Sequence, residues 1–175
     1  MTERARAVTR RTALLTSSLA FTPIVRSRAD EPPALRQDRL LVKKSQRLMF
    51  LMAGDQILRT YPIALGDAPL GPKRAEGDQR TPEGSYAIDG RNPNSRYHLS
   101  LHISYPNPSD VRAASAAGVS PGGDIFIHGL PEDFGGTDPF MFTADWTDGC
   151  IGVGNRAIEE LWARIPDGFP LLIRA

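Results

Sequence analysis

Glycine and proline residues interrupt this chain at short intervals along most of its length. The 175 residues include 16 Gly and 15 Pro, and these separate short apolar runs from one another. Turn-forming residues at this density leave room for many short strands and for few long helices. We therefore predict a mostly β fold, in which residues 39–175 have the size of one domain.

Short strands are predicted where apolar residues alternate with polar ones or lie between turns. The predicted strands cover 39–43, 47–52, 56–65, 85–88, 97–104, 124–128 and 169–173. One short helix is predicted over 110–117 with Asp110 as its N-cap, and a second begins at Asn155, also as an N-cap. The segment 129–147 is expected to be a long loop, and loops of this length are usually functional.

The N-terminal segment has the pattern of an export signal. Residues 9–15 read Thr-Arg-Arg-Thr-Ala-Leu-Leu, which is typical of a twin-arginine signal. The apolar stretch that follows is too short to cross a bilayer ~30 Å thick. We expect residues 1–29 to be the signal, 30–38 a short linker and 39–175 a domain in the periplasm or cell envelope. A disordered basic tail and a retained membrane anchor are the alternatives.

Charge and histidine content argue against two classes of function. The net charge is +1, so nothing favours binding to nucleic acid. Of the three histidines, His98 and His102 lie on one face of a predicted strand, roughly 13 Å apart. That separation is too large for chelation of one ion, and zinc usually needs three or four ligands. We expect no metal, no cofactor and no transmembrane span in the mature protein.

Cys150 is the only cysteine of the chain. Cysteines of exported proteins are usually paired, so a single one pairs with another chain, lies inert in the core or serves as a reactive thiol. Its neighbours favour the reactive thiol, because Gly149 and Gly152 flank it in a tight loop. Glycines there let backbone N–H groups approach a bound ligand closely.

A reactive thiol needs a base, because little thiolate exists at neutral pH without one. His128 ends the apolar run Ile-Phe-Ile-His and lies at the edge of the predicted long loop. That loop can fold back and bring His128 to Cys150. The alternative for His128 is a histidine at a strand end that is hydrogen-bonded to backbone.

Four segments resemble the L,D-transpeptidase (YkuD-type) catalytic-domain family. They are residues 77–86, 92–101, 127–131 and 145–151. The last reads Asp-Trp-Thr-Asp-Gly-Cys-Ile and is similar to a subgroup with Asp-Trp-Thr-x-Gly-Cys. The resemblance extends over residues 40–173. It implies a β-sandwich of mixed sheets with a long active-site loop and one or two short helices.

The resemblance also implies roles for individual residues. Cys150 would be the nucleophile and His128 the proton acceptor and donor. The backbone N–H groups of Gly149 and Cys150 would stabilise the oxyanion, with Thr147 in support. Gly129 would allow close approach beside the histidine.

Substrate contacts are less defined by the resemblance. His98, Arg96, Asp148 and Trp146 are the candidate substrate-binding residues. Asp148 stands where the family motif has a second histidine, and we expect it to point away from the thiolate or to bind a substrate ammonium. Gly152 stands where many relatives carry arginine, so the group that would bind a substrate carboxylate is undefined.

The reaction implied is acyl transfer on peptidoglycan stem peptides. The thiolate attacks the carbonyl of the L-centre of diaminopimelate and expels the terminal D-Ala. The acyl group then passes to an amine of another stem, to a lysine of a wall-linked lipoprotein or to water. An endopeptidase or amidase that uses the same Cys–His pair is the first alternative. A non-catalytic wall-binding module is the second.

Overall fold

The computed structural model describes residues 38–131 and 142–175. The predicted export signal (1–29) and all but the last residue of the predicted linker (30–38) lie outside the described residues. The middle of the predicted long loop, residues 132–141, lies outside them as well.

Eight strands form one mixed sheet in the order β3-β2-β1-β8-β4-β5-β6-β7. The strands are β1 (Arg39–Lys43), β2 (Leu48–Ala53), β3 (Gln56–Pro62), β4 (Gly84–Ser95), β5 (His98–Ile103), β6 (Phe126–His128), β7 (Ile151–Gly152) and β8 (Pro170–Arg174). The pairs β1–β8 and β6–β7 are parallel, and the others are antiparallel. The prediction of a mostly β fold with mixed strand pairing and two short helices is confirmed.

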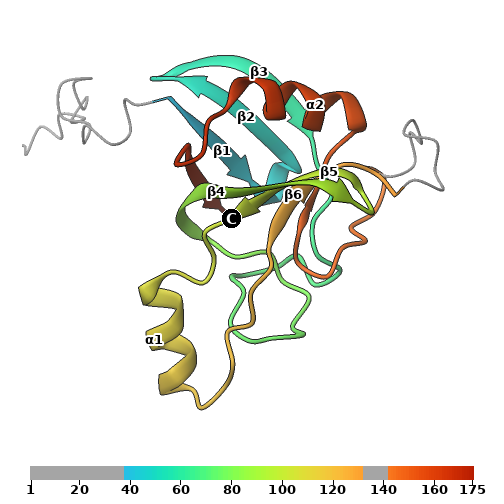
Figure 1. Cartoon of the computed structure of the whole chain (residues 1–175). Coiled ribbons are helices and arrows are strands. Elements are labelled where there is room, and N and C mark those ends of the chain that lie inside the picture. The colour runs from blue at the N-terminus through green and yellow to red at the C-terminus, as the bar shows by residue number, and fades with distance from the viewer. Residues whose placement is uncertain (1–37, 132–141) are drawn as a thin grey trace, which may run out of the picture. The chain divides into compact units, whose positions relative to one another are not determined.

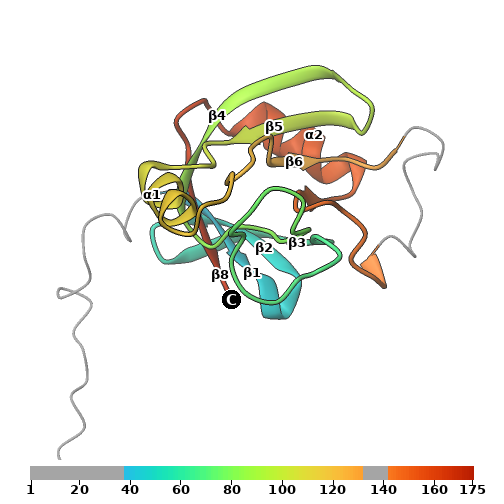
Figure 2. The ribbon, with the colours of Figure 1, turned by 90° about the horizontal axis from the view of Figure 1, so that it is seen from below.

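Strand β4 joins the two halves of this sheet (Figures 1 and 2). Its first four residues, from Gly84, pair with β8, and its later residues, from Ile88 to Ser95, pair with β5. The register shifts twice along the second half, which lets the strand bend between its two partners. The expected sandwich of mixed sheets is therefore one continuous sheet whose halves share β4.

A single core cluster lies between the halves of the sheet and α2 (Asn155–Arg164). Ile158 and Leu161, one turn apart on α2, are both fully buried in it. Each such side chain contributes about 1.5–3 kcal/mol through burial. Because α2 contacts β5 and β6, this packing holds in place the strand that ends at His128.

Both predicted helix caps are wrong, the first by three residues and the second by one. The helix α1 (Pro108–Ala116) begins earlier than expected, because the Asn107 side chain accepts bonds from the amides of Ser109 and Asp110. Asp110 is the third residue of that helix and completes a capping box by accepting from the Asn107 amide. The N-cap of α2 is Gly154, and the Asn155 side chain instead accepts a bond from the Leu130 amide at 2.8 Å.

Two strand boundaries differ from the prediction by three residues or more. The strand predicted over 85–88 continues to Ser95, through polar residues that a hydrophobic pattern does not mark as strand. The strand predicted over 56–65 ends at Pro62. The residues that follow are buried, and Ala64 forms an isolated bridge with Gly152 in front of the sheet edge. That edge carries the candidate site.

Candidate active site

The short parallel pair β6–β7 brings the predicted histidine and cysteine together. Ile127 pairs with Ile151 and His128 with Gly152, so Cys150 lies two positions from the partner of His128 on the same face. Standard strand spacings then put the Cα atoms of His128 and Cys150 roughly 8 Å apart. Both isoleucines are fully buried, which fixes this register.

A cavity of about 300 Å³ lies over this pair of strands. Its lining residues are Asn92, Asn94, Ser95, Arg96, Tyr97, Ser100, Phe126, His128, Trp146, Thr147, Asp148 and Cys150. The cavity thus contains both members of the predicted catalytic pair and four other predicted site residues. His98 does not line this cavity: it lines a neighbouring hollow, and its Nε2 lies 2.7 Å from a carboxylate oxygen of Glu159.

The imidazole of His128 has a defined hydrogen-bond partner. Its Nδ1 lies 2.8 Å from the carbonyl oxygen of Gly129, which can only accept, so Nδ1 carries the proton. Nε2 is then the unprotonated nitrogen that can act as a base. Burial lowers the pKa of His128 below its usual 6.5, although the bond to Gly129 partly opposes this effect. Burial therefore favours the neutral imidazole.

Two aromatic rings hold the imidazole in place. The Tyr97 ring lies 4.4 Å from it between centroids, and the Trp146 ring lies edge-on at 5.6 Å. The residue after His128 must be small, because a Cβ at Gly129 would lie 2.6 Å from Asn155 Oδ1 and 2.8 Å from the Tyr97 carbonyl oxygen. Trp146 thus contacts the histidine as well as lining the cavity, and Gly129 permits the close approach that was expected.

The thiol of Cys150 is partly buried, and two backbone groups face it. The Phe126 N–H donates to Sγ at 3.4 Å, and the carbonyl oxygen of Asp124 lies 3.7 Å from Sγ. Burial raises the pKa of the Cys150 thiol; the Phe126 N–H opposes this, and the carboxylates of Asp148 and Asp124 add to it. His128 lines the same cavity, and its unprotonated Nε2 is the candidate acceptor for the proton of this thiol.

The turn before the cysteine is braced by Thr147. Its hydroxyl donates to the Cys150 carbonyl at 2.7 Å and accepts from the Gly149 N–H at 3.2 Å. Gly149 has φ +121°, and a Cβ there would lie 2.6 Å from the Arg80 carbonyl oxygen, so only glycine fits. Because the Gly149 N–H already bonds Thr147, the Cys150 N–H is the better candidate for the predicted oxyanion donor.

One ion pair near the site was not predicted from the sequence. Arg47 donates to the Asp145 carboxylate through Nε at 2.9 Å and through Nη2 at 2.6 Å. The same carboxylate accepts from the Leu65 N–H at 2.9 Å, while the amides of Trp146 and Thr147 both donate to the Leu65 carbonyl. These bonds tie the segment before Cys150 to the β1–β2 connection. Arg47 has a left-handed φ of +52°, which nothing in the sequence pattern signals.

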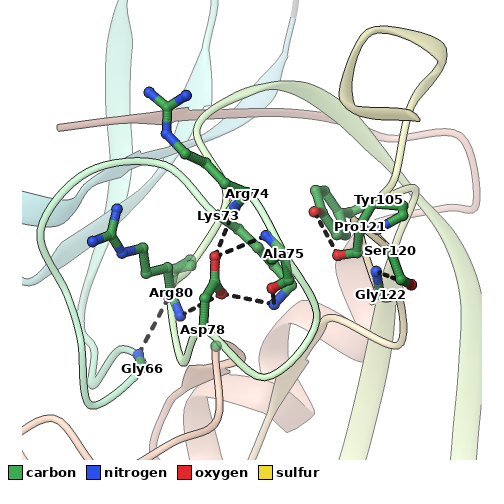
Figure 3. A network of polar contacts seen from close by, with 12 residues as sticks. Gly66, Lys73, Arg74, Ala75, Asp78, Arg80, Tyr105, Ser120, Pro121 and Gly122 are labelled. Atoms are coloured by element: carbon green, nitrogen blue, oxygen red, sulfur yellow. Dashed lines mark hydrogen bonds and ion pairs between the residues drawn. The ribbon is translucent and has the colours of Figure 1, made fainter. Parts of the chain in front are cut away.

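A second hollow of about 420 Å³ borders the same cysteine. Asp78 organises one wall of it, accepting from the amides of Arg74 and Ala75 at 2.7 and 3.1 Å and from Lys73 Nζ at 2.9 Å (Figure 3). Burial raises the pKa of Asp78, but these hydrogen bonds outweigh it, and the net pKa lies below the usual 3.8. The ion pair offsets the charge of Lys73, which lines the hollow.

Metal ligation finds no support in the described part of the chain. Residues 38–131 and 142–175 contain no group of three or more His, Cys, Asp or Glu side chains placed to hold an ion. His102 is engaged with Asp89 through Nδ1, and His98 with Glu159.

A model of the L,D-transpeptidase catalytic domain (YkuD) matches residues 37–173. The chain therefore belongs to the L,D-transpeptidase catalytic-domain family. YafK of Escherichia coli strain K12, provisionally assigned as an L,D-transpeptidase, is 30% identical over 154 residues, which are 85% of this chain and 55% of YafK. The chain thus spans little more than half the length of that relative.

Solved structures show the same fold. Pgp2 of Campylobacter jejuni, a helical cell shape determining protein, matches with a TM-score of 0.59 at 26% identity, over 77% of this chain and 46% of Pgp2. Bd1075 of Bdellovibrio bacteriovorus matches with a TM-score of 0.53 at 30% identity, over 82% of this chain and 50% of Bd1075. An L,D-transpeptidase of Xylanimonas cellulosilytica shares the fold at 14% identity and a TM-score of 0.54, over 82% and 63% of the two chains.

Family membership supports a function related to peptidoglycan. Neither of the two helices in the described ranges is long and apolar enough to cross a membrane.

Proposed function

We propose that this domain is a cysteine acyltransferase that acts on peptidoglycan stem peptides through a thioester. The observation that carries the proposal is the shared cavity of Cys150 and His128, with the basic nitrogen of the imidazole left unprotonated. Membership of the L,D-transpeptidase family supports the substrate class.

In the first half of the reaction, His128 Nε2 takes the proton of Sγ–H as Sγ attacks the carbonyl carbon of the L-centre of diaminopimelate. The oxygen becomes an oxyanion, stabilised by the Cys150 N–H. As the tetrahedral intermediate collapses, His128 returns that proton to the departing nitrogen of the terminal D-Ala. The products are a thioester on Cys150 and free D-Ala.

In the second half, an amine attacks the thioester carbonyl while His128 Nε2 takes a proton from it. Collapse of the second intermediate releases the sulfur, which recovers the proton from His128. The amine comes from a second stem peptide in the proposed reaction. A lysine of a wall-linked lipoprotein or a water molecule would give different products from the same thioester.

This chemistry requires access to the cell wall. The arginine pair and apolar run of residues 9–25 would direct export to the periplasm or cell envelope.

The test is incubation of residues 30–175 with purified disaccharide-tetrapeptide, with products read by mass spectrometry. Crosslinked dimers with release of D-Ala are expected, and Cys150→Ala and His128→Gln should abolish both. Arg112→Ala, a change on the exposed helix α1, is the matched control and should retain activity. Loss of amide bonds without dimers would identify a hydrolase instead. Wall binding without turnover, unchanged by Cys150→Ala, would identify a binding module and contradict the proposal.

A further inference from the structure

Two side chains of opposite charge line the cavity that contains Cys150. Arg96 and Asp148 are its arginine and aspartate, while burial favours the neutral forms of the His128 imidazole and the Cys150 thiol. Within residues 38–131 and 142–175, neither Arg96 nor Asp148 has a hydrogen bond or ion pair that would occupy it. The Arg96 guanidinium and the Asp148 carboxylate are therefore available to a ligand in the cavity that Cys150 also lines.

Arg96 lies in the β4–β5 turn, and this turn also carries Tyr97, whose ring packs against His128. Arg96 and Tyr97 form the turn between Ser95 and His98, which pair across β4 and β5. The buried Ser95 hydroxyl accepts a bond from the Tyr97 N–H at 3.1 Å, and the Tyr97 ring lies against His128. The guanidinium thus extends from a turn whose position relative to the imidazole is fixed.

The backbone that carries Asp148 is fixed as well. Thr147 and Gly149 on either side of it are buried, and the bond between them closes the turn. The Asp148 side chain is exposed and also borders the second hollow beside Cys150, together with Asp124. The negative end of the site is therefore on the cysteine turn, and the positive end is on the β4–β5 turn.

Position 152 cannot supply the cation of this cavity. A Cβ at Gly152 would lie 2.8 Å from Trp146 Cζ2, so the indole occupies the space into which any side chain would extend. The described lining contains no second arginine or lysine. Arg96 is consequently the group that can meet a carboxylate there.

We propose that Arg96 and Asp148 select a substrate residue that carries both a free carboxylate and a free ammonium. The guanidinium binds the carboxylate through paired N–H donors, and the Asp148 carboxylate binds the ammonium. Held at this one charged centre, the residue presents the acyl carbonyl of its other centre to Sγ. This inference rests on the proposed function, in which diaminopimelate is the acyl donor and bears such a zwitterionic centre.

The test compares three substrates with matched variants of residues 30–175. The substrates are disaccharide-tetrapeptides with diaminopimelate, with diaminopimelate amidated at its free carboxylate, and with that residue's free ammonium acetylated. For the parent substrate, Arg96→Ala should raise KM about 10- to 100-fold with little change in kcat. The amidated substrate should show KM unchanged by Arg96→Ala, because its carboxylate is already absent.

Asp148→Asn gives the complementary comparison. It should raise KM for the parent and amidated substrates and leave KM for the acetylated one unchanged. Arg112→Ala is the control for loss of a positive charge elsewhere. Thermal unfolding should be the same for all variants, because Arg96, Asp148 and Arg112 are exposed.

Two results separate this inference from the proposed function. If the parent protein turns over none of the three substrates, the proposed function fails. If it is active but Arg96→Ala changes KM equally for parent and amidated substrates, or not at all, the assignment of Arg96 and Asp148 is overturned and the reaction stands. Binding of the parent substrate to Cys150→Ala, measured by calorimetry, repeats the comparison without turnover.

Discussion

Replacement of Asp145 by alanine should destabilise the domain and disable the site together. The carboxylate accepts both the Arg47 guanidinium and the Leu65 N–H. Leu65 is fully buried, so loss of the acceptor for its N–H should cost about 1–3 kcal/mol. The ion pair adds only about 1 kcal/mol, because the Arg47 side chain is 34% exposed and partly screened. The expected loss is about 2–4 kcal/mol.

The assay is urea unfolding followed by circular dichroism, with kcat/KM measured under native conditions. Asp145→Asn keeps an oxygen for the Leu65 N–H and should lose about 1–3 kcal/mol less than Asp145→Ala. Asp167→Ala is the matched control, since Asp167 also pairs with an arginine but is 61% exposed, and its effect should lie within about 0.5 kcal/mol.

Activity should fall further than stability explains, because the Trp146 and Thr147 amides are held by the same segment. A loss below 1 kcal/mol for Asp145→Ala, or full activity of the folded variant, would refute this account of how the cysteine turn is held.

Three other predictions follow from the site. Burial lowers the pKa of His128, so the ascending limb of the pH–rate profile of kcat/KM should be centred below pH 6.5, where the imidazole loses its proton. An ascending limb centred above pH 7 would contradict this. With His128→Gln, alkylation of Cys150 by iodoacetamide should have its midpoint above pH 9.0, since burial raises the pKa of the thiol. Gly149→Ala should lower the free energy of unfolding by more than about 3 kcal/mol in thermal unfolding, because the added Cβ meets the Arg80 carbonyl oxygen. Gly123→Ala is the control, since a Cβ there meets open space, and it should leave the free energy of unfolding unchanged. Equal losses of stability in the two variants would argue against a steric role for Gly149.

Most of the strands, and the two residues Cys150 and His128 that line one cavity, have local signatures that sequence reasoning can use. Alternation of apolar residues marks β5, and Cys150 is conspicuous as a single cysteine between glycines. The packing of α2 could be predicted from the spacing of Ile158, Leu161 and Trp162.

What sequence reasoning missed depends on contacts between distant segments. The pairing of Arg47 with Asp145 joins positions with no shared pattern, and the arginine adopts a backbone conformation usually associated with glycine. Asn155 was expected to cap its own helix, but the Leu130 amide offers its side chain a tertiary partner. The local sequence indicates which hydrogen bonds a side chain can form, whereas the tertiary contacts of the fold determine which of them form.

The contact between the indole of Trp146 and Gly152 has a consequence for how such sequences diversify. The two positions share one volume, so they cannot vary independently: a large ring at 146 requires the absence of a side chain at 152, and a longer residue at 152 requires a smaller one at 146. Homologues should therefore separate into two groups at this pair, and a chain that combined both large residues would have to move the turn that carries its cysteine.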